Sequence, residues 1–412
     1  MKYVIIGNSA AAVGCIEGIR SVDKEGSITV ISDEKHHTYS RPLISYLLLG
    51  KTTEQKMKYR DSGFYKKNGV NAMLGEKALK IDPKAKTVTT DKGNVIEYDK
   101  LLCATGSSPM IPPMAGLETV KKQFTFMTLD SAKALKKAVD KRSKVLIVGA
   151  GLIGLKCAEG ISESVGSITV VDLAPRILSS ILDEKGAHLV QSHLEKHGLK
   201  FYLGDCVSQF EENTATLKSG AKLDFDTLVL AVGVRPNVSL VSEAGGKVER
   251  GIIIDKKMKT TLDDVYAAGD CTVSHDISSG TDRILALLPN AYMQGETAGI
   301  NMAGGKHSFD KALPLNAIGF FGLHMVTAGS YIGEPVVKEK DGSYKALFCD
   351  KDRLKGFIMI GDIDKAGIYT SLIREKTPLH TLDTDLIFDH PSLMAFGKQK
   401  RAEMLAGAKK TK

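Results

Sequence analysis

The sequence predicts an α/β protein with two Rossmann-like dinucleotide-binding domains, because two glycine-rich segments each follow a short apolar run that resembles a strand. The first segment is KYVIIGNSAAA near the start of the chain, and the second is KVLIVGAGLIG from Lys144 to Gly154. Either segment alone also fits a tight turn in a parallel sheet that binds no nucleotide. Two of them in one chain indicate that one polypeptide holds two dinucleotides.

The second segment has the complete GxGxxG pattern, with Gly149, Gly151 and Gly154 at its glycine positions. The first glycine permits the tight turn, the second lets the pyrophosphate approach the backbone, and the third lets the helix pack on the strand. The phosphate is expected to lie against free N–H groups at the start of the helix. Leu152 and Ile153 are therefore part of the predicted site.

An acidic residue in the next strand-like run bears on the choice of nucleotide. Residues 167–171 are followed by Asp172, whose carboxylate can accept a hydrogen bond from an adenosine ribose hydroxyl. This favours NAD(H) over its 2′-phosphorylated form. Arg176 lies close to Asp172 in the sequence and leaves NADPH open as the alternative.

The first segment departs from the pattern, since Gly7 is followed by Ser9 and Ala12 where glycines are expected. Small residues can still fit there, so a second nucleotide is predicted at this loop. Its acidic partner is Glu34 or Asp33. The loop residues assigned to this site are Gly7, Ser9, Ala10 and Ala11.

The composition is that of an ordinary folded enzyme, with 412 residues, 43% hydrophobic and 25% charged residues, enough for two or three domains. The first apolar run begins at Lys2, which leaves no room for a signal peptide, and no apolar run has the length needed to span a bilayer. We therefore expect a cytoplasmic protein without a membrane partner.

The formal net charge is +8, with lysines far more numerous than arginines. One interpretation is an ordinary solvated surface, and the other is a basic face that steers an acidic partner onto the protein. The lysines are spread along the chain and no nucleic-acid-binding motif is present, so no nucleic-acid partner is expected.

The six cysteines include no CxxC pair and no close cluster, so neither a zinc site nor an iron–sulfur site is predicted. They are Cys15, Cys103, Cys157, Cys206, Cys271 and Cys349. We expect reduced, mostly buried thiols and no bound metal.

Five further motifs follow one another along the chain. They are YSRPL at 39–43, ATG at 104–106, AVGVRPN at 231–237, VYAAGD at 265–270 and the run from Pro289 to Gly295. In this order they resemble the pyridine nucleotide-dependent flavoproteins with two dinucleotide-binding domains. Within that family, the chain is most similar to rubredoxin reductases and to the flavin portion of assimilatory nitrite reductases.

The resemblance implies FAD in the first site and NAD(H) in the second. Asp270 is then expected to bond the ribityl chain, and the helix after Pro289 points its N-terminus at the flavin ring, where it stabilises reduced flavin. The FAD contacts implied are Gly7, Ser9, Ala10, Ala11, Glu34, Arg41, Pro42, Ala78, Ala104, Thr105, Gly106, Gly269, Asp270 and Pro289. The NAD contacts implied are Gly149, Gly151, Leu152, Ile153, Gly154, Asp172 and Gly233.

The resemblance also implies a domain organisation like that of glutathione reductase. Residues 1–112 and 243–312 form a discontinuous FAD domain, with the NAD domain inserted at 113–242. A smaller α+β module at 313–378 resembles the family's C-terminal interface domain. Residues 379–412 form an extension without a counterpart. Relatives include both dimers and monomers, so a homodimer is one of two open expectations.

The chain lacks the cysteines that many relatives place beside the flavin. Disulfide reductases of this fold carry a redox pair after the second strand, and coenzyme A disulfide reductases and water-forming NADH oxidases carry one cysteine there. Here Pro42 takes that place, and no cysteine lies between Cys15 and Cys103. Thiol exchange at the flavin is not expected, because it needs a thiolate at the ring. No siroheme part is present either, so an iron centre is expected in a partner.

Two positions near the presumed flavin N5 depart from the family pattern. Many relatives pair a lysine near the end of the YxRPxLS segment with a glutamate two residues after the third NAD-loop glycine. This chain has Tyr46 and Lys156 there. Either Lys156 supplies the cation near N5 from the opposite side, which makes it the candidate catalytic residue, or it points to solvent or pairs with a neighbouring acid.

The resemblance implies an NADH-dependent flavoprotein reductase. Hydride passes to flavin N5, and electrons then pass singly to a small acidic carrier of the rubredoxin or ferredoxin type, or to an iron–sulfur subunit. Net flow in the opposite direction is equally compatible with the sequence. The alternatives are an NADH oxidase that reduces dioxygen, a flavoprotein subunit that organises a larger redox complex, and an enzyme acting on a small organic substrate.

Overall fold

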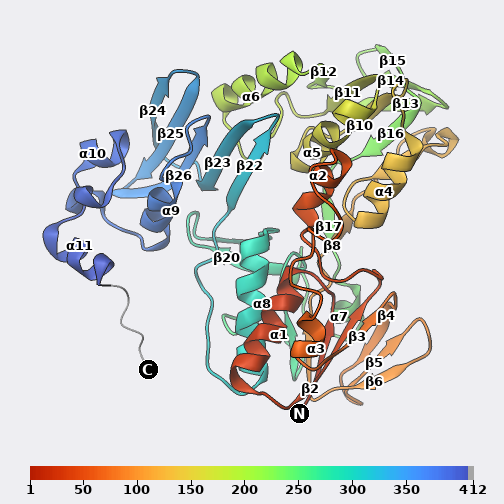
Figure 1. The fold of residues 1–412 in the computed structure, drawn as a ribbon, viewed down its shortest axis with the longest axis vertical. Coiled ribbons are helices and arrows are strands. Elements are labelled where there is room, and N and C mark those ends of the chain that lie inside the picture. The colour runs from red at the N-terminus through yellow and green to blue at the C-terminus, as the bar shows by residue number, and fades with distance from the viewer. Residues whose placement is uncertain (407–412) are drawn as a thin grey trace. The chain divides into compact units, whose positions relative to one another are not determined.

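The computed structural model describes residues 1–406 and divides into two compact units. The first unit contains residues 1–274 and 282–310, and the second contains residues 275–281 and, of the described residues, 311–406. Figure 1 shows the elements of each unit.

The first unit contains two five-stranded parallel sheets, each with one crossover helix directly after its central strand. The sheet nearer the N-terminus has the order β19-β7-β1-β2-β3. Its strands are β1 (Lys2–Ile6), β2 (Ser27–Ser32), β3 (Val70–Leu74), β7 (Lys100–Cys103) and β19 (Val265–Ala267). Its central strand is β1, which is buried from Tyr3 to Ile6.

The second sheet has the order β12-β11-β10-β16-β9. Its strands are β9 (Gln123–Thr125), β10 (Lys144–Val148), β11 (Ser167–Asp172), β12 (Leu199–Leu203) and β16 (Thr227–Leu230). The first sheet takes β19 from beyond this segment, so the second sheet is an insertion into the first. Two parallel sheets of this order confirm the predicted fold class.

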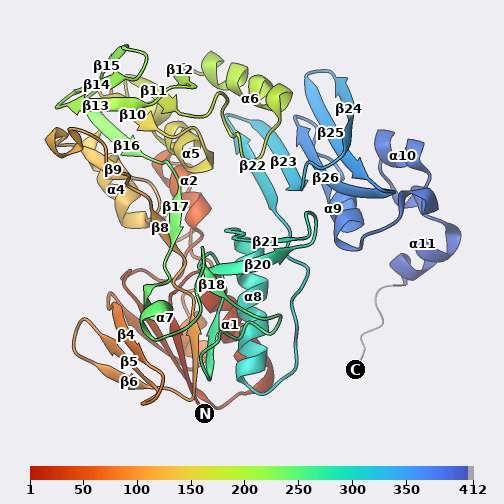
Figure 2. The same cartoon turned by 180° about the vertical axis from the view of Figure 1, so that it is seen from behind.

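Short elements complete the first unit. The antiparallel pair β8 and β17 joins the segments that enter and leave the inserted sheet, and the sheet of β4, β5 and β6 can be followed in Figure 2. Strands β13, β14 and β15 form a further three-stranded sheet. The short strands of the first unit are β4 (Ala78–Asp82), β5 (Thr87–Thr90), β6 (Val95–Glu97), β8 (Ser107–Pro109), β13 (Val207–Glu211), β14 (Thr214–Leu217), β15 (Lys222–Asp224), β17 (Val234–Pro236) and β18 (Ile252–Ile253). The helices are α1 (Ala10–Val22), α2 (Ile44–Leu48), α3 (Phe64–Lys67), α4 (Leu129–Ala138), α5 (Leu152–Ile161), α6 (Glu184–Lys196), α7 (Ser239–Glu243) and α8 (Leu288–Met302).

Helices α1 and α8 pack backbone to backbone through glycines. A Cβ atom added at Gly295 would lie 2.0 Å from the Ala11 oxygen, and one at Gly299 would lie 2.2 Å from the Cys15 oxygen. Gly14, on the other helix, leaves equally little room. Any larger side chain would push the helices apart, so this contact fixes the start of α8 beside the first glycine-rich loop.

The second unit is built on an antiparallel sheet of order β22-β23-β26-β25-β24. Its strands are β22 (Leu315–Phe320), β23 (Leu323–Gly329), β24 (Glu334–Lys340), β25 (Ser343–Asp350) and β26 (Arg353–Ile360), and its helices are α9 (Ala366–Arg374), α10 (Thr384–Asp389) and α11 (Lys398–Leu405). Strands β20 (Thr272–Asp276) and β21 (Thr281–Arg283) lie where the chain passes between the units.

Residues 379–396 pack on this sheet. Ile387 and Phe396 are buried in one cluster with Phe357 and Tyr369, and the Tyr369 hydroxyl donates to the Ile387 carbonyl at 2.8 Å. The described part of the extension therefore shares the core of the module before it. The domain boundaries expected from the sequence remain a proposal. No helix in residues 1–406 has the length and hydropathy that a membrane span needs.

Replacing Gly295 by alanine should lower the stability of the first unit, because the new methyl group meets the Ala11 backbone. Overpacking of this kind costs about 1–3 kcal/mol. We expect a lower thermal midpoint by circular dichroism. Gly367→Ala in α9 is the matched control, since nothing lies within 4 Å of its added Cβ, and it should leave the midpoint unchanged or slightly raised. Equal midpoints for the two variants would contradict the close packing of α1 and α8.

Candidate functional site

The first glycine-rich loop is a tight turn between β1 and α1. Gly7 has a φ of 116°, and a Cβ there would lie 2.1 Å from the Ala104 oxygen, so only glycine fits. Ser9 is the N-cap residue of α1 in an extended conformation. The loop therefore presents N–H groups at a helix start, the arrangement that binds a dinucleotide pyrophosphate.

A cavity opens beside this loop. It is lined by the loop, the end of β2, three side chains from the segment that follows (His36, Tyr39 and Arg41), the turn after β7, residues 268–270 and the start of α8. Most residues of the predicted FAD set line this cavity: Gly7, Ser9, Ala10, Ala11, Glu34, Arg41, Ala104, Thr105, Gly106, Gly269 and Asp270. The structure thus gathers segments that lie far apart in the sequence.

Three residues of the predicted set do not line this cavity. Pro42 follows Arg41 in a short 3-10 turn, and Pro289 follows the lining residue Leu288 in the first turn of α8. Ala78 is buried at the start of β4. The FAD contacts assigned to these three remain a proposal.

Several lining residues were not predicted from the sequence. They are Asn8, Ser32, His36, Tyr39, Ser107, Met127, Ala268, Leu288 and Ala291. Asp33, which the sequence offered as the alternative to Glu34, also lines the cavity. Tyr39 belongs to the YSRPL motif and could have been found there, whereas no pattern marks His36. Met127 comes from the inserted segment, so only the folded chain reveals it.

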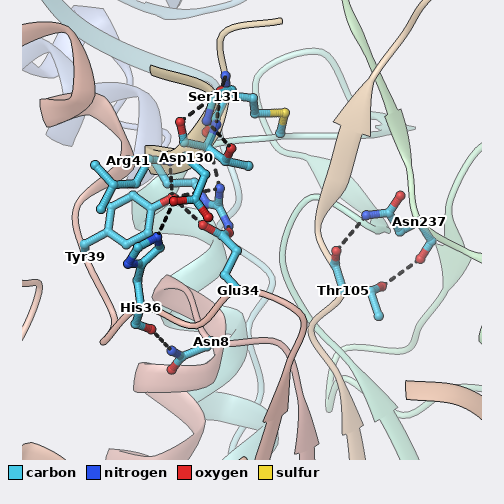
Figure 3. Close-up of polar contacts among 12 residues, drawn as sticks. Asn8, Glu34, His36, Tyr39, Arg41, Thr105, Asp130, Ser131 and Asn237 are labelled. Carbon is cyan, nitrogen blue, oxygen red and sulfur yellow. Dashed lines mark hydrogen bonds and ion pairs between the residues drawn. The ribbon is translucent and has the colours of Figure 1, made fainter. Parts of the chain in front are cut away.

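A polar network closes one side of the cavity (Figure 3). The Tyr39 hydroxyl donates to Glu34 Oε2 at 2.7 Å and accepts from the Leu129 N–H at 2.9 Å. Arg41 pairs with the other Glu34 oxygen and donates to the Met127 carbonyl at 3.2 Å. Burial raises the pKa of Tyr39, so its hydroxyl keeps its proton and its role as a donor. Glu34 is held with its charge matched by Arg41.

The same network reaches the start of α4. His36 Nε2 lies 2.8 Å from Asp130 Oδ1, and the Asn8 side chain donates to the His36 carbonyl at 3.1 Å (Figure 3). The hydrogen bond from His36 lowers the pKa of Asp130. The FAD-side loop is thereby joined to the first turn of the first helix in the inserted segment.

A second set of hydrogen bonds joins the two segments through which the chain enters and leaves the inserted sheet (Figure 3). The Thr105 hydroxyl donates to the Asn237 carbonyl at 2.7 Å, and the Asn237 amide donates to the Thr105 carbonyl at 2.8 Å. Ser108 donates to the Asn237 side-chain oxygen at 2.8 Å. These hydrogen bonds connect the ATG and RPN motifs, and we call them the Thr105–Asn237 clasp.

Asp270 supplies a further acceptor in the lining of the cavity. Burial raises the pKa of its carboxyl group, and Arg41 opposes this rise. One of its two oxygens, Oδ2, accepts a long hydrogen bond of 3.5 Å from the Ser107 hydroxyl. A carboxylate in this setting can accept from ligand hydroxyls. Together with the loop N–H groups, the acid Glu34 and the start of α8, it fits the demands of a flavin dinucleotide.

The second glycine-rich loop repeats the geometry of the first. Gly149 has a φ of 115°, and a Cβ there would lie 2.3 Å from the Ala231 oxygen. A Cβ at Gly154 would lie 2.0 Å from the Gly149 oxygen. Helix α5 begins at Leu152, directly after Gly151, and Ile153 is its second residue. These positions match the roles expected of a GxGxxG loop.

Asp172 lies at the end of β11, beside this loop. Its Oδ2 accepts from the Ala150 N–H at 2.6 Å, and its Oδ1 accepts from the Ala174 N–H at 2.8 Å. Arg176 donates to the Leu182 carbonyl at 3.4 Å. Gly233 has a φ of 125° in the turn after β16. The NAD contacts assigned to Asp172 and Gly233 remain a proposal.

The candidate catalytic residue lies where α2 and α5 meet. A Cβ at Gly160 of α5 would lie 3.2 Å from the Ser45 oxygen of α2, so the helices touch. Lys156 pairs with Glu159, and the two side chains are only 13% and 7% exposed. The Lys156 ammonium lies 4.7 Å from the centroid of the Tyr46 ring. Lys156 therefore pairs with a neighbouring acid and does not point to solvent, as the second interpretation allowed. Its role as the cation near flavin N5 remains a proposal.

Four of the six cysteines are buried, whereas Cys206 and Cys349 are partly exposed. Cys15, Cys103, Cys157 and Cys271 are buried, and burial raises the pKa of each thiol. Pro42 is the second residue of the 3-10 turn Arg41–Leu43. Within residues 1–406, no group of three or more His, Cys, Asp or Glu side chains is placed to hold a metal ion.

Comparison with known proteins assigns the family. Residues 1–295 match the pyridine nucleotide-disulphide oxidoreductase model. The chain is 34% identical to subunit epsilon of the NADH-dependent phenylglyoxylate dehydrogenase of Aromatoleum evansii, over 92% of this chain and 93% of that protein. It is 32% identical to the assimilatory nitrate reductase electron transfer subunit of Bacillus subtilis, over 91% of this chain and 49% of that protein.

More distant relatives support the same family assignment. The rubredoxin-NAD(+) reductase of Pseudomonas putida is 28% identical over 74% of this chain and 80% of that protein. The reductase in a covalent putidaredoxin reductase–putidaredoxin complex has the same fold, with a TM-score of 0.86 at 22% identity, over 99% of both chains. The chain spans about half the length of the Bacillus subtilis relative.

The chain therefore belongs to the pyridine nucleotide-disulphide oxidoreductase family. It is an NADH-dependent flavoprotein oxidoreductase, and its cofactors are FAD and NAD(H). The resemblance drawn from the ordered motifs is confirmed.

Replacing Glu34 by glutamine should weaken FAD binding. The change removes the negative charge that holds Arg41 and replaces one of the two oxygens that accept from Arg41 and Tyr39 by an NH2 donor, while it keeps the size of the side chain. Losing one charged hydrogen bond costs about 1.5–3 kcal/mol, so we expect at least tenfold weaker binding. Fluorescence titration of the FAD-free protein measures it. Glu118→Gln, at an exposed position, is the control, and an equal effect in both variants would reject the assigned role.

Proposed function

We propose that this protein passes electrons between NAD(H) and a small acidic iron–sulfur or rubredoxin-type carrier, or an iron–sulfur subunit, without a redox-active disulfide. The observation that carries the proposal is the pair of matching nucleotide loops at Gly7 and Gly149, combined with Pro42 where relatives of other classes carry a cysteine. FAD, when bound, accepts a hydride from NADH at N5 and passes electrons on singly.

The residues of the chain supply placement and charge for this chemistry. Glu34, Arg41 and Tyr39 orient the adenosine end of the first nucleotide, and Asp270 accepts hydrogen bonds farther along the cavity. The start of α8 favours negative charge at the flavin ring. Asp172 receives the ribose of the second nucleotide and favours NADH over NADPH.

The case for a protein acceptor rests on the relatives and on charge. The Pseudomonas putida relative is named for rubredoxin, and two others are named as subunits of larger enzymes. The net charge of +8 suits an acidic partner. The subunit names favour a second candidate, in which the protein is the flavoprotein subunit of a larger redox complex and its acceptor is a fellow subunit.

Lys156 is proposed as the cation beside the reacting end of the two nucleotides. Helix α5 begins at the second nucleotide loop, and α2 follows the segment that lines the first cavity. Lys156 lies where these helices touch, held by Glu159 and the Tyr46 ring. A positive charge at this place favours reduced flavin. The lysine reaches it from the NAD side, opposite to the pattern of many relatives.

Anaerobic titration with NADH tests the proposed function. The flavin band should bleach near one equivalent of NADH and recover rapidly when oxidised rubredoxin or ferredoxin is added. Prior treatment with iodoacetamide should not change either step, because no thiol takes part. Recovery that requires dioxygen, with carriers inert, would instead identify an oxidase. A flavin that NADH cannot reduce would reject the reductase proposal.

Lys156→Ala should slow flavin reduction at least tenfold in stopped-flow measurements, with NADH affinity nearly intact. The ammonium is almost fully shielded from water, where one charge has a larger effect than on the surface. Lys156→Arg keeps the charge and should retain most of the rate. Lys133→Ala, which removes a surface lysine paired with Glu54 at 2.7 Å, is the control. An unchanged rate in Lys156→Ala would reject this role.

A further inference from the structure

Helix α11 differs from the other long helices of the second unit, because it has no buried side chain in the described structure. It follows a 3-10 turn at 393–395 and begins after Gly397 (Figure 1). A helix this short is marginal in water unless it packs on something. Within residues 1–406, its own chain gives it little to pack on.

Charge is concentrated in this part of the sequence. Residues 398–412 contain six basic residues and one acidic residue, a net formal charge of +5, whereas the whole chain carries +8. In α11 the basic residues are Lys398, Lys400 and Arg401, and Lys400 pairs with Glu403 at 3.3 Å. These residues therefore supply five of the eight net positive charges of the chain, and residues 398–406 supply two of those five.

Exposed apolar side chains accompany these charges. Met394 is 67% exposed and Leu405 is 74% exposed, and Leu393 and Met404 are also exposed. The Arg401 guanidinium lies 2.9 Å from the Met394 sulfur, which joins the turn to the helix. We call this set the C-terminal patch, and its members are Leu393, Met394, Lys398, Lys400, Arg401, Met404 and Leu405.

We propose that the C-terminal patch docks the acidic redox protein that exchanges electrons with this enzyme. The proposal rests on the proposed function and names a place where that partner is held. A cluster of positive charge speeds the encounter with an acidic surface and fixes its register. Methionines adapt their shape to a partner surface, and exposed apolar atoms gain free energy when the partner covers them.

Other occupants fit less well. A membrane-surface helix needs a broad apolar face rich in Leu, Phe or Trp, whereas α11 offers only Met404 and Leu405 as large apolar side chains. A second copy of this chain would bring one basic patch against another or against a surface of the same net sign. An acidic protein removes both difficulties, because it neutralises the charge and covers the apolar atoms.

The test measures binding of an acidic ferredoxin, in its oxidised form, to the full-length FAD-loaded protein. The charge-reversal variant is K398E/K400E/R401E, and K398R/K400R/R401K keeps the charge. The matched control, K84E/K92E/K218E, reverses three exposed lysines of the first unit. We expect the first variant to weaken binding at least tenfold, the second to match the wild type, and the control to change binding less than twofold. Wild-type affinity should fall as salt is raised.

Turnover separates this proposal from the proposed function. NADH:benzoquinone activity, which needs no protein partner, should be equal in all variants, while the ferredoxin KM should rise only in K398E/K400E/R401E. Selective loss of binding in a protein whose flavin NADH cannot reduce would support docking and reject the reductase function. The docking proposal would be overturned if the control weakened ferredoxin binding equally, or if the wild type did not bind ferredoxin. It would also be overturned if charge reversal changed only the binding to anionic phosphatidylserine vesicles, or only the self-association measured by sedimentation.

Discussion

The fold depends on one backbone contact that occurs twice. At Gly7 and again at Gly149, the turn after a central strand passes so close to the residue that follows a neighbouring strand, Ala104 after β7 or Ala231 after β16, that no Cβ fits. In each sheet the glycine N–H donates 2.8 Å to the end of the neighbouring strand, at Ile31 and Val171. With this contact, each loop presents N–H groups to a pyrophosphate; without it, the strand, turn and helix could not keep their spacing.

The two sheets are also tied to each other. The Tyr39 and Arg41 side chains, which line the first cavity, bond the backbone of Leu129 and Met127 in the inserted segment. The Thr105–Asn237 clasp connects the two segments that enter and leave the inserted sheet. The residues that hold the first nucleotide thus also hold the segment that carries the second. Such coupling suits an enzyme whose two nucleotides must meet at their reactive ends.

Much of this was predictable from local sequence. The loops at Gly7 and Gly149 follow from strand, glycine and helix signals that lie within a dozen residues, and the acids at the strand ends follow from spacing. Contacts made by distant segments were not predictable. Nothing near His36 in the sequence indicates Asp130, and the contact of Lys156 with the Tyr46 ring depends on α2 and α5 meeting. The pairing of Lys156 with Glu159, by contrast, lies within one helix, and the sequence allowed it.

A crystal structure with FAD and NAD⁺ both bound tests the central claim most directly. The account predicts the FAD pyrophosphate against the Gly7 loop, the NAD⁺ pyrophosphate against the Gly149 loop, and the nicotinamide facing the flavin ring near Lys156. A single nucleotide spanning both loops, exchanged positions of the two cofactors, or a nicotinamide far from the flavin would contradict it.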